Sequence, residues 1–148
     1  MNEPLHIIVD TREQRAWSYP ESLARTTRGT LACADYRLAG DTGFAIERKS
    51  LDDFIGTITS GWDRFERELD RMDDAKFPAK IILVEGTVSD ILREDYNHHR
   101  VKPKLVLKKI AILTLSGVSI LFTSNAHEAA GVALSIFWER AKYLEESR

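Results

Sequence analysis

Two acidic side chains, Asp35 and Glu47, are separated by a stretch with the pattern of a β-hairpin. Residues 36–38 and 44–46 favour strands, and residues 39–43 between them have the composition of a turn. If the hairpin is centred on the middle of that turn, the two acids face each other with their Cβ atoms about 5 Å apart. The sequence therefore predicts two carboxylates on one small patch of a sheet.

Lys49 belongs to the same patch, because strand alternation sends Glu47 and Lys49 to one face of the sheet. Like charges that lie opposite each other destabilise a sheet, so a compensating group is expected. Mg²⁺ fits this need, since one or two carboxylates bind it together with waters and phosphate oxygens. The lysine would then orient or deprotonate a water, or stabilise charge on a phosphoryl oxygen. A solvated hairpin with a Glu–Lys contact explains the same pattern without chemistry, and the pattern alone leaves both readings open.

Three short motifs occur in order along the chain. Residues 8–13 read IVDTRE, residues 34–36 read ADY, and residues 47–53 read ERKSLDD. They resemble the VDxRE, GDY and ERKxxxD motifs of the nuclease domain of the XPF family of structure-specific DNA endonucleases, which includes the archaeal helicase-nuclease Hef. The resemblance extends over essentially the whole chain, with further matching segments at residues 64–65, 81–86 and 118–124. Ala34 departs from the family, which has glycine there, and this should cost little because alanine is the smallest alternative.

The resemblance implies a metal-dependent active site. Asp35 and Glu47 would be direct ligands of Mg²⁺ or Mn²⁺, and Asp10 or Glu13 would complete the acidic site through water or a second ion. Such an ion polarises the scissile phosphate and lowers the pKa of the attacking water, which Lys49 would position. The implied catalytic set is Asp10, Glu13, Asp35, Glu47, Arg48, Lys49 and Asp53, and the implied metal ligands are Asp10, Asp35 and Glu47.

Two members of this set have competing explanations. Arg48 points away from Glu47 and Lys49 in a regular strand, so contact with phosphate needs a twist or bulge there. Asp53 falls at the third position of a helix that Ser50 can cap, where an acid complements the helix dipole. The family pattern also includes Asp53, which would support Lys49 or Arg48.

The resemblance implies hydrolysis of DNA phosphodiester bonds, in branched or flapped DNA. Two other functions compete with this one: a non-catalytic dimer partner or scaffold, and a nuclease of the same fold acting on other substrates, such as a resolvase or restriction-like enzyme. Retention of the acids and the lysine favours an active nuclease. The helicase and tandem helix-hairpin-helix domains of larger relatives are not part of this sequence. Substrate recognition is therefore expected to depend on a dimer, a partner, or the loop at residues 95–104.

The overall charge argues against a strongly basic nucleic-acid binder. The formal net charge is −2 and the pI is about 6.1, whereas affinity for DNA comes largely from neutralised phosphates. Basic residues must therefore act locally, with bound metal ions adding charge at the site. The candidate phosphate contacts are Arg12, Arg64, Arg100 and Lys102.

The alternation of strand and helix patterns predicts an α/β fold, a single domain over residues 1–148 in which helices flank a central mixed sheet. The resemblance implies the restriction-endonuclease-like form of this fold. The predicted strands are residues 5–9, 30–34, 36–38, 44–46, 81–84 and 118–122. The predicted helices are residues 20–28, 62–75, 87–93 and 103–116, one that Ser50 caps and one that Ser124 or Asn125 caps.

The last predicted helix is apolar over a wide arc, which indicates a second surface to cover. In XPF-type domains the last helices form the dimer contact, so the resemblance implies a homodimer. The single cysteine, Cys33, excludes a disulfide within the chain and is expected to be buried. No apolar run approaches the length of a membrane span and no signal-peptide pattern is present, so an intracellular protein is expected.

Overall fold

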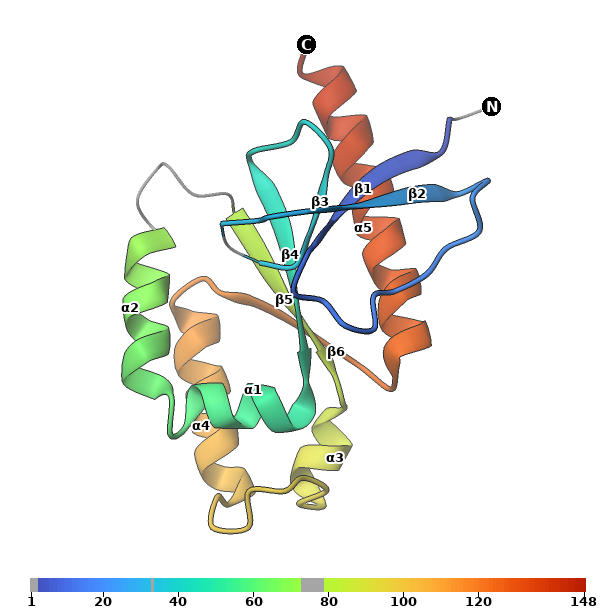
Figure 1. The fold of residues 1–148 in the computed structure, drawn as a ribbon. Coiled ribbons are helices and arrows are strands. Elements are labelled where there is room, and N and C mark those ends of the chain that lie inside the picture. The colour runs from blue at the N-terminus through green and yellow to red at the C-terminus, as the bar shows by residue number, and fades with distance from the viewer. Residues whose placement is uncertain (1–2, 33, 73–78) are drawn as a thin grey trace.

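The computed structural model describes residues 3–32, 34–72 and 79–148 (Figure 1). Its six strands form one mixed sheet in the order β2-β1-β3-β4-β5-β6. The β1–β2, β4–β5 and β5–β6 pairs are parallel, and the β1–β3 and β3–β4 pairs are antiparallel. The strands are β1 Leu5–Asp10, β2 Ala24–Gly29, β3 Tyr36–Leu38, β4 Phe44–Ser50, β5 Ala79–Glu85 and β6 Ser119–Thr123.

Helices lie on both faces of this sheet, as the α/β pattern predicts (Figure 1). One face packs against α5, with Phe137 and Ala133 in a core that includes Ile7, Tyr36 and Ile46. The helices α1, α2 and α4 pack with the other face over β5 and β6. The helices are α1 Leu51–Ile58, α2 Trp62–Met72, α3 Val88–Leu92, α4 Pro103–Leu115 and α5 Ala126–Glu146. Within the described residues, no helix has the length and apolar character that a membrane crossing needs.

The β3–β4 hairpin has the register that the sequence predicts, because Tyr36 pairs with Ile46 around a turn centred on Asp41. The carboxylate of Asp41 accepts hydrogen bonds from Nε and a terminal nitrogen of Arg140 on α5, at 2.8 and 2.9 Å, and from the backbone of Gly43. Since Asp41 is buried, this ion pair fixes the hairpin turn against α5.

Two predicted elements between β1 and β3 are wrong. In place of the helix predicted at residues 20–28, residues 24–29 form β2, which pairs in parallel with β1. The backbone amides of Leu23 and Ala24 both bond the carbonyl of Pro20, so the proline opens a turn instead of a helix. The predicted strand at residues 30–34 is absent from the described part of that segment. These errors arise because pairing with β1, distant in sequence, outweighs the local preference.

The other elements agree with the predictions within a few residues. Ser50 caps α1 by accepting the Asp53 amide, and Asn125, not Ser124, caps α5. The predicted end of the helix at residue 75 and the predicted burial of Cys33 lie outside the described residues.

Ala34 adopts a left-handed backbone conformation, with φ of 69°. Among the described non-glycine residues, only Ala34 and Glu94 have positive φ. The expectation that alanine costs little here therefore needs correction, since this region penalises a Cβ by about 1 kcal/mol or more.

Ala34→Gly should raise the free energy of unfolding by about 0.5–1 kcal/mol, because removing the Cβ relieves more strain than the added chain entropy costs. Urea denaturation of both proteins measures the difference. Ala39→Gly is the matched control, since Ala39 has no positive φ, and it should lower stability. Equal losses in both variants would show that Ala34 is unstrained.

Candidate active site at the β3–β4 hairpin

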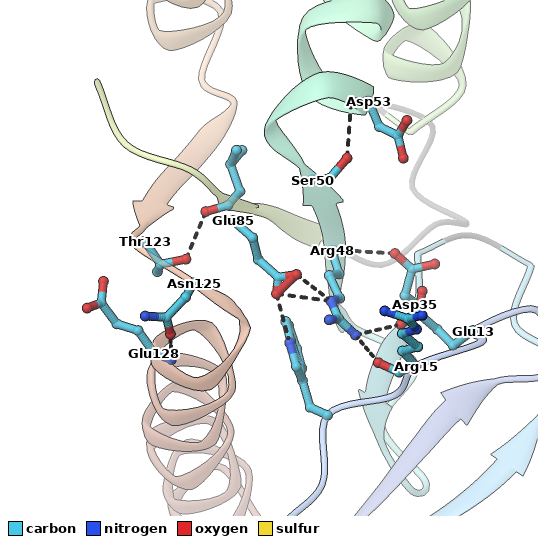
Figure 2. A network of polar contacts seen from close by, with 12 residues as sticks. Glu13, Arg15, Asp35, Arg48, Ser50, Asp53, Glu85, Thr123, Asn125 and Glu128 are labelled. Carbon is cyan, nitrogen blue, oxygen red and sulfur yellow. Dashed lines mark hydrogen bonds and ion pairs between the residues drawn. The ribbon is translucent and has the colours of Figure 1, made fainter. Parts of the chain in front are cut away.

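Asp35 lies where β1, β3 and β4 meet (Figure 2). Its carbonyl accepts the Asp10 amide at 2.8 Å, and its own amide donates to the carbonyl of Ile46 at 3.0 Å. The next bond departs from a regular ladder, because the Arg48 amide donates at 2.8 Å to Oδ2 of the Asp35 side chain. The carboxylate is thereby held beside the start of the ERK motif.

The neighbouring acids act on Asp35 electrostatically. Burial is the largest of the effects that raise its pKa to about 6; the negative charges of Glu13 and Glu47 add to it, and the Arg48 amide and Lys49 oppose it. Glu47 is therefore close enough to repel Asp35, as the sequence predicts for the patch, and Glu13 adds to that repulsion.

Glu47 carries an ammonium at each carboxylate oxygen. Lys80 Nζ lies 3.0 Å from Oε1 and Lys49 Nζ lies 3.5 Å from Oε2. Burial alone would raise the pKa of Glu47, but the two lysines outweigh it and hold the pKa below its ordinary value. The predicted placement of Glu47 and Lys49 on one face is confirmed by this contact.

Lys80 is a contact of the candidate site that sequence reasoning missed. The parallel β4–β5 register would have indicated this contact, because Ala45 pairs with Lys80 and Glu47 with Ile82. Paired residues share a face of the sheet, so Lys80 points to the side that carries Glu47. This could have been found only by pairing the two strands correctly.

Asp10 is buried and its carboxylate is already engaged. Oδ2 lies 2.6 Å from Arg12 Nε, and Oδ1 accepts the Leu31 amide at 3.0 Å. Burial raises the pKa of Asp10, but these hydrogen bonds prevail and leave it below the ordinary value. Asp10 therefore anchors the segment after β2 and places the exposed Arg12 near Asp35, where their charges interact.

Arg48 lies on the opposite face of β4, as strand alternation predicts, among acids of other elements (Figure 2). Its Nε is 3.0 Å from a Glu85 oxygen, and a terminal nitrogen is 3.2 Å from Glu13. The guanidinium lies over the Trp17 ring at 5.1 Å, and the Tyr36 hydroxyl donates to Glu13 at 2.8 Å. Arg48 therefore ties the loop after β1 to β4 and β5, and sequence reasoning missed Glu85 and Trp17 as its partners.

A cavity of about 530 Å³ opens beside Lys49 between α1 and α2. Asp53 and Arg64 line it, together with His98 from the loop before α4. The Asp53 amide caps α1 through Ser50, and no hydrogen bond or ion pair joins its carboxylate to Lys49 or Arg48 within the described residues. The helix-start explanation of Asp53 thus agrees with the geometry, and its exposed carboxylate faces the cavity.

The four predicted phosphate contacts are separated by the fold. Arg64 is exposed on the wall of the cavity, and Arg12 is exposed beside Asp10. Arg100 and Lys102 are exposed on the loop between α3 and α4 and do not line the cavity. That loop reaches the cavity through His98, whose Nε2 lies 2.9 Å from the Asp52 carbonyl oxygen.

The carboxylates of the site fit a hard divalent cation whose remaining ligands come from water and substrate. Among the described residues, no group of three or more His, Cys, Asp or Glu side chains is arranged to hold a metal ion. Asp35 and Glu47 supply two carboxylates, and Mg²⁺ is commonly bound by one or two, with waters and substrate phosphates as its other ligands. Repulsion around Asp35 would be relieved by such a cation.

Comparison with known proteins gives concordant matches. A family model described as the ERCC4 domain matches residues 9–136. A protein of Methanocaldococcus jannaschii, whose name describes it as an ATP-dependent RNA helicase, is 28% identical over 134 residues. XPF from Aeropyrum pernix has 23% identity and a TM-score of 0.67 over 91% of this chain. Its complex with DNA has 26% identity and a TM-score of 0.71 over 93% of this chain.

These matches confirm the predicted family resemblance and the predicted fold, a mixed six-stranded sheet flanked by helices. The chain spans 15% of the length of the M. jannaschii protein, and 61% and 66% of the two XPF chains.

Asp35→Asn should stabilise the metal-free protein at pH 7.5 by about 1–2 kcal/mol, a figure reduced from the full pKa shift because the group is partly exposed. The folded pKa of about 6 exceeds the unfolded value, so the native state binds the proton more tightly. Wild-type stability therefore falls as pH rises from about 4 to about 6, and the advantage of the variant should vanish by pH 4.

Urea denaturation in EDTA across this pH range measures the effect. Asp70→Asn, at an exposed position on α2, is the matched control and should leave stability unchanged at both pH values. A variant less stable than wild type at pH 7.5 would contradict the raised pKa of Asp35.

Proposed function

The chain belongs to the ERCC4 domain family, and on that premise we propose that it is a divalent-metal-dependent endonuclease that hydrolyses phosphodiester bonds in branched or flapped DNA. The observation that carries the proposal is that the charges of Glu47 and Lys49 both act on Asp35, while Lys49 pairs with Glu47 and borders an open cavity. The match to a solved XPF–DNA complex supports DNA as the substrate.

Asp35 and Glu47 are the residues that would hold Mg²⁺ or Mn²⁺. When bound, such an ion polarises the scissile phosphate and lowers the pKa of the attacking water. The Arg48 amide fixes the direction of the Asp35 carboxylate. Lys49 is partly exposed at the cavity, so its ammonium can orient the water and stabilise charge on a phosphoryl oxygen. Hydrogen bonds within the protein engage Asp10, Glu13 and Arg48, which hold the strands and loops around this centre in place.

The cavity between α1 and α2 gives the DNA strand a path to Lys49. Arg64 on its wall is proposed as a phosphate contact, and Arg12, whose charge interacts with that of Asp35, as a second contact. Arg100 and Lys102 would reach only DNA that extends past His98. Because the net charge is negative, binding should depend on these local charges and weaken steeply with salt.

A non-catalytic dimer partner or scaffold is the second candidate function. It is disfavoured because the acids and the lysine of the motif are present and are brought together. A scaffold would have no need to keep mutually repelling carboxylates in one patch.

We also propose a homodimer through the C-terminal elements. Strand β6 lies at one edge of the sheet. Large apolar side chains are exposed on α4, β6 and α5, at Leu105, Leu107, Ile112, Leu115, Leu121 and Tyr143. An exposed apolar surface of this kind indicates a protein partner, and in the family the last helices form the dimer.

The purified chain should nick flap or four-way-junction DNA in Mg²⁺ or Mn²⁺ and lose this activity in EDTA. Asp35→Asn and Lys49→Met should each reduce the single-turnover rate by about 100-fold or more, since each removes a group that acts on the water, ion or phosphate. Gel assays with duplex, flap and junction substrates measure the rates.

Asp70→Asn should retain the wild-type rate, which separates loss of chemistry from loss of fold. Cleavage that persists in Asp35→Asn or Lys49→Met would remove this site assignment. Absence of cleavage by the wild-type chain on every substrate would favour the scaffold.

Leu121→Glu and Leu115→Glu should shift the chain from dimer to monomer at micromolar concentration, because each buries a charge in the apolar contact. Sedimentation equilibrium measures the mass. Leu92→Glu is the matched control, as Leu92 is an exposed leucine on α3, and it should remain dimeric. A monomeric wild-type chain would refute the proposed dimer.

A further inference from the structure

Lys80 is a nearly buried lysine at the start of β5, with 5% of its side chain exposed. Its Nζ lies 3.0 Å from Oε1 of Glu47, whose own side chain is 14% exposed. Lysine is rarely buried without a partner, because the ammonium loses its hydration. The pair with Glu47 supplies that compensation, so this contact should persist in the metal-free protein.

The two lysines at Glu47 differ in what else they can do. Lys49 is 22% exposed, lies 3.5 Å from the other oxygen and borders the cavity. It can turn toward a substrate phosphate. Lys80 does not line that cavity. Among the ion pairs of the described residues, Glu47 is the one carboxylate that Lys80 contacts. Its positive charge therefore acts on the site through Glu47.

We propose that Lys80 is an internal competitor for the divalent cation at Glu47, which lowers the affinity of the DNA-free protein for the ion and couples metal binding to the arrival of a DNA phosphate. The proposal rests on the proposed function, in which Glu47 is a metal ligand. In this role Lys80 is a positioning residue that acts through Glu47.

The physical reason is repulsion between cations that share one carboxylate. An ion bound to Glu47 would lie within a few ångströms of the ammonium, where a partly buried site screens charge poorly. A phosphate adds negative charge and oxygen ligands, which offset that repulsion. Metal and DNA should therefore bind with positive coupling, each raising the affinity for the other by the same factor.

Lys80→Met tests the proposal, since methionine retains an unbranched apolar stem while removing the charge. Mn²⁺ binding to the full chain without DNA is measured by the electron paramagnetic resonance signal of free Mn²⁺. The affinity of Lys80→Met should exceed that of wild type by about tenfold or more. Lys80→Arg retains the charge and should bind Mn²⁺ as wild type does.

Lys142→Met is the matched control, because Lys142 pairs with Glu139 on the exposed surface of α5, and it should not change the affinity. Glu47→Gln should abolish the gain when combined with Lys80→Met. Flap DNA with a non-cleavable phosphorothioate linkage should raise the Mn²⁺ affinity of wild type more than that of Lys80→Met.

Mn²⁺ affinity in Lys80→Met equal to or below that of wild type would overturn the role of Lys80, while metal-dependent cleavage by wild type would leave the proposed function standing. Failure of wild type to bind Mn²⁺ even with DNA would overturn both. Thermal unfolding with and without Mn²⁺ checks the fold of each variant. Lys80→Gln replaces Lys80→Met if the latter does not fold, with the same expected gain.

Discussion

The hydrogen bond from the Arg48 amide to the Asp35 carboxylate is the interaction on which the site depends. Strand β3 has only three residues, and Asp35 lies just before it. At this point a side chain takes the place of a backbone acceptor in the ladder between β3 and β4. The carboxylate is thereby fixed to the strand that carries Glu47 and Lys49. The same strand pairing that forms the hairpin therefore brings the charges of Asp35 and Glu47 near each other.

Strand β4 separates two charge networks of different character. On one face, Glu47 is neutralised by lysines at its two oxygens, while burial and neighbouring acids disfavour the charged form of Asp35. On the other face, the Arg48 guanidinium is enclosed by Glu13 and Glu85 and lies over Trp17. The charges of the Arg48 network are paired within the protein and stabilise β4. The network of Asp35 and Glu47 retains repulsion between carboxylates, which is typical of sites where stability is lost in favour of binding or catalysis.

The hairpin is also fixed at its turn, where Asp41 pairs with Arg140 of α5. The same guanidinium lies 5.3 Å from the ring of Tyr143, which is exposed on the surface proposed for the dimer. Removing either partner of a buried ion pair leaves an uncompensated charge and is costly. The β3–β4 hairpin and the C-terminal helix are therefore held together by this ion pair.

The sequence by itself determined the local features: the register of the hairpin, the common face of Glu47 and Lys49, and the Ser50 cap beside Asp53. Each is set by side-chain period, turn composition or capping within a few residues. Only the tertiary structure decided that residues 24–29 form a strand and that Lys80 reaches Glu47. Those features arise from parallel pairing between segments distant in the chain, and no local pattern specifies which strand lies beside which.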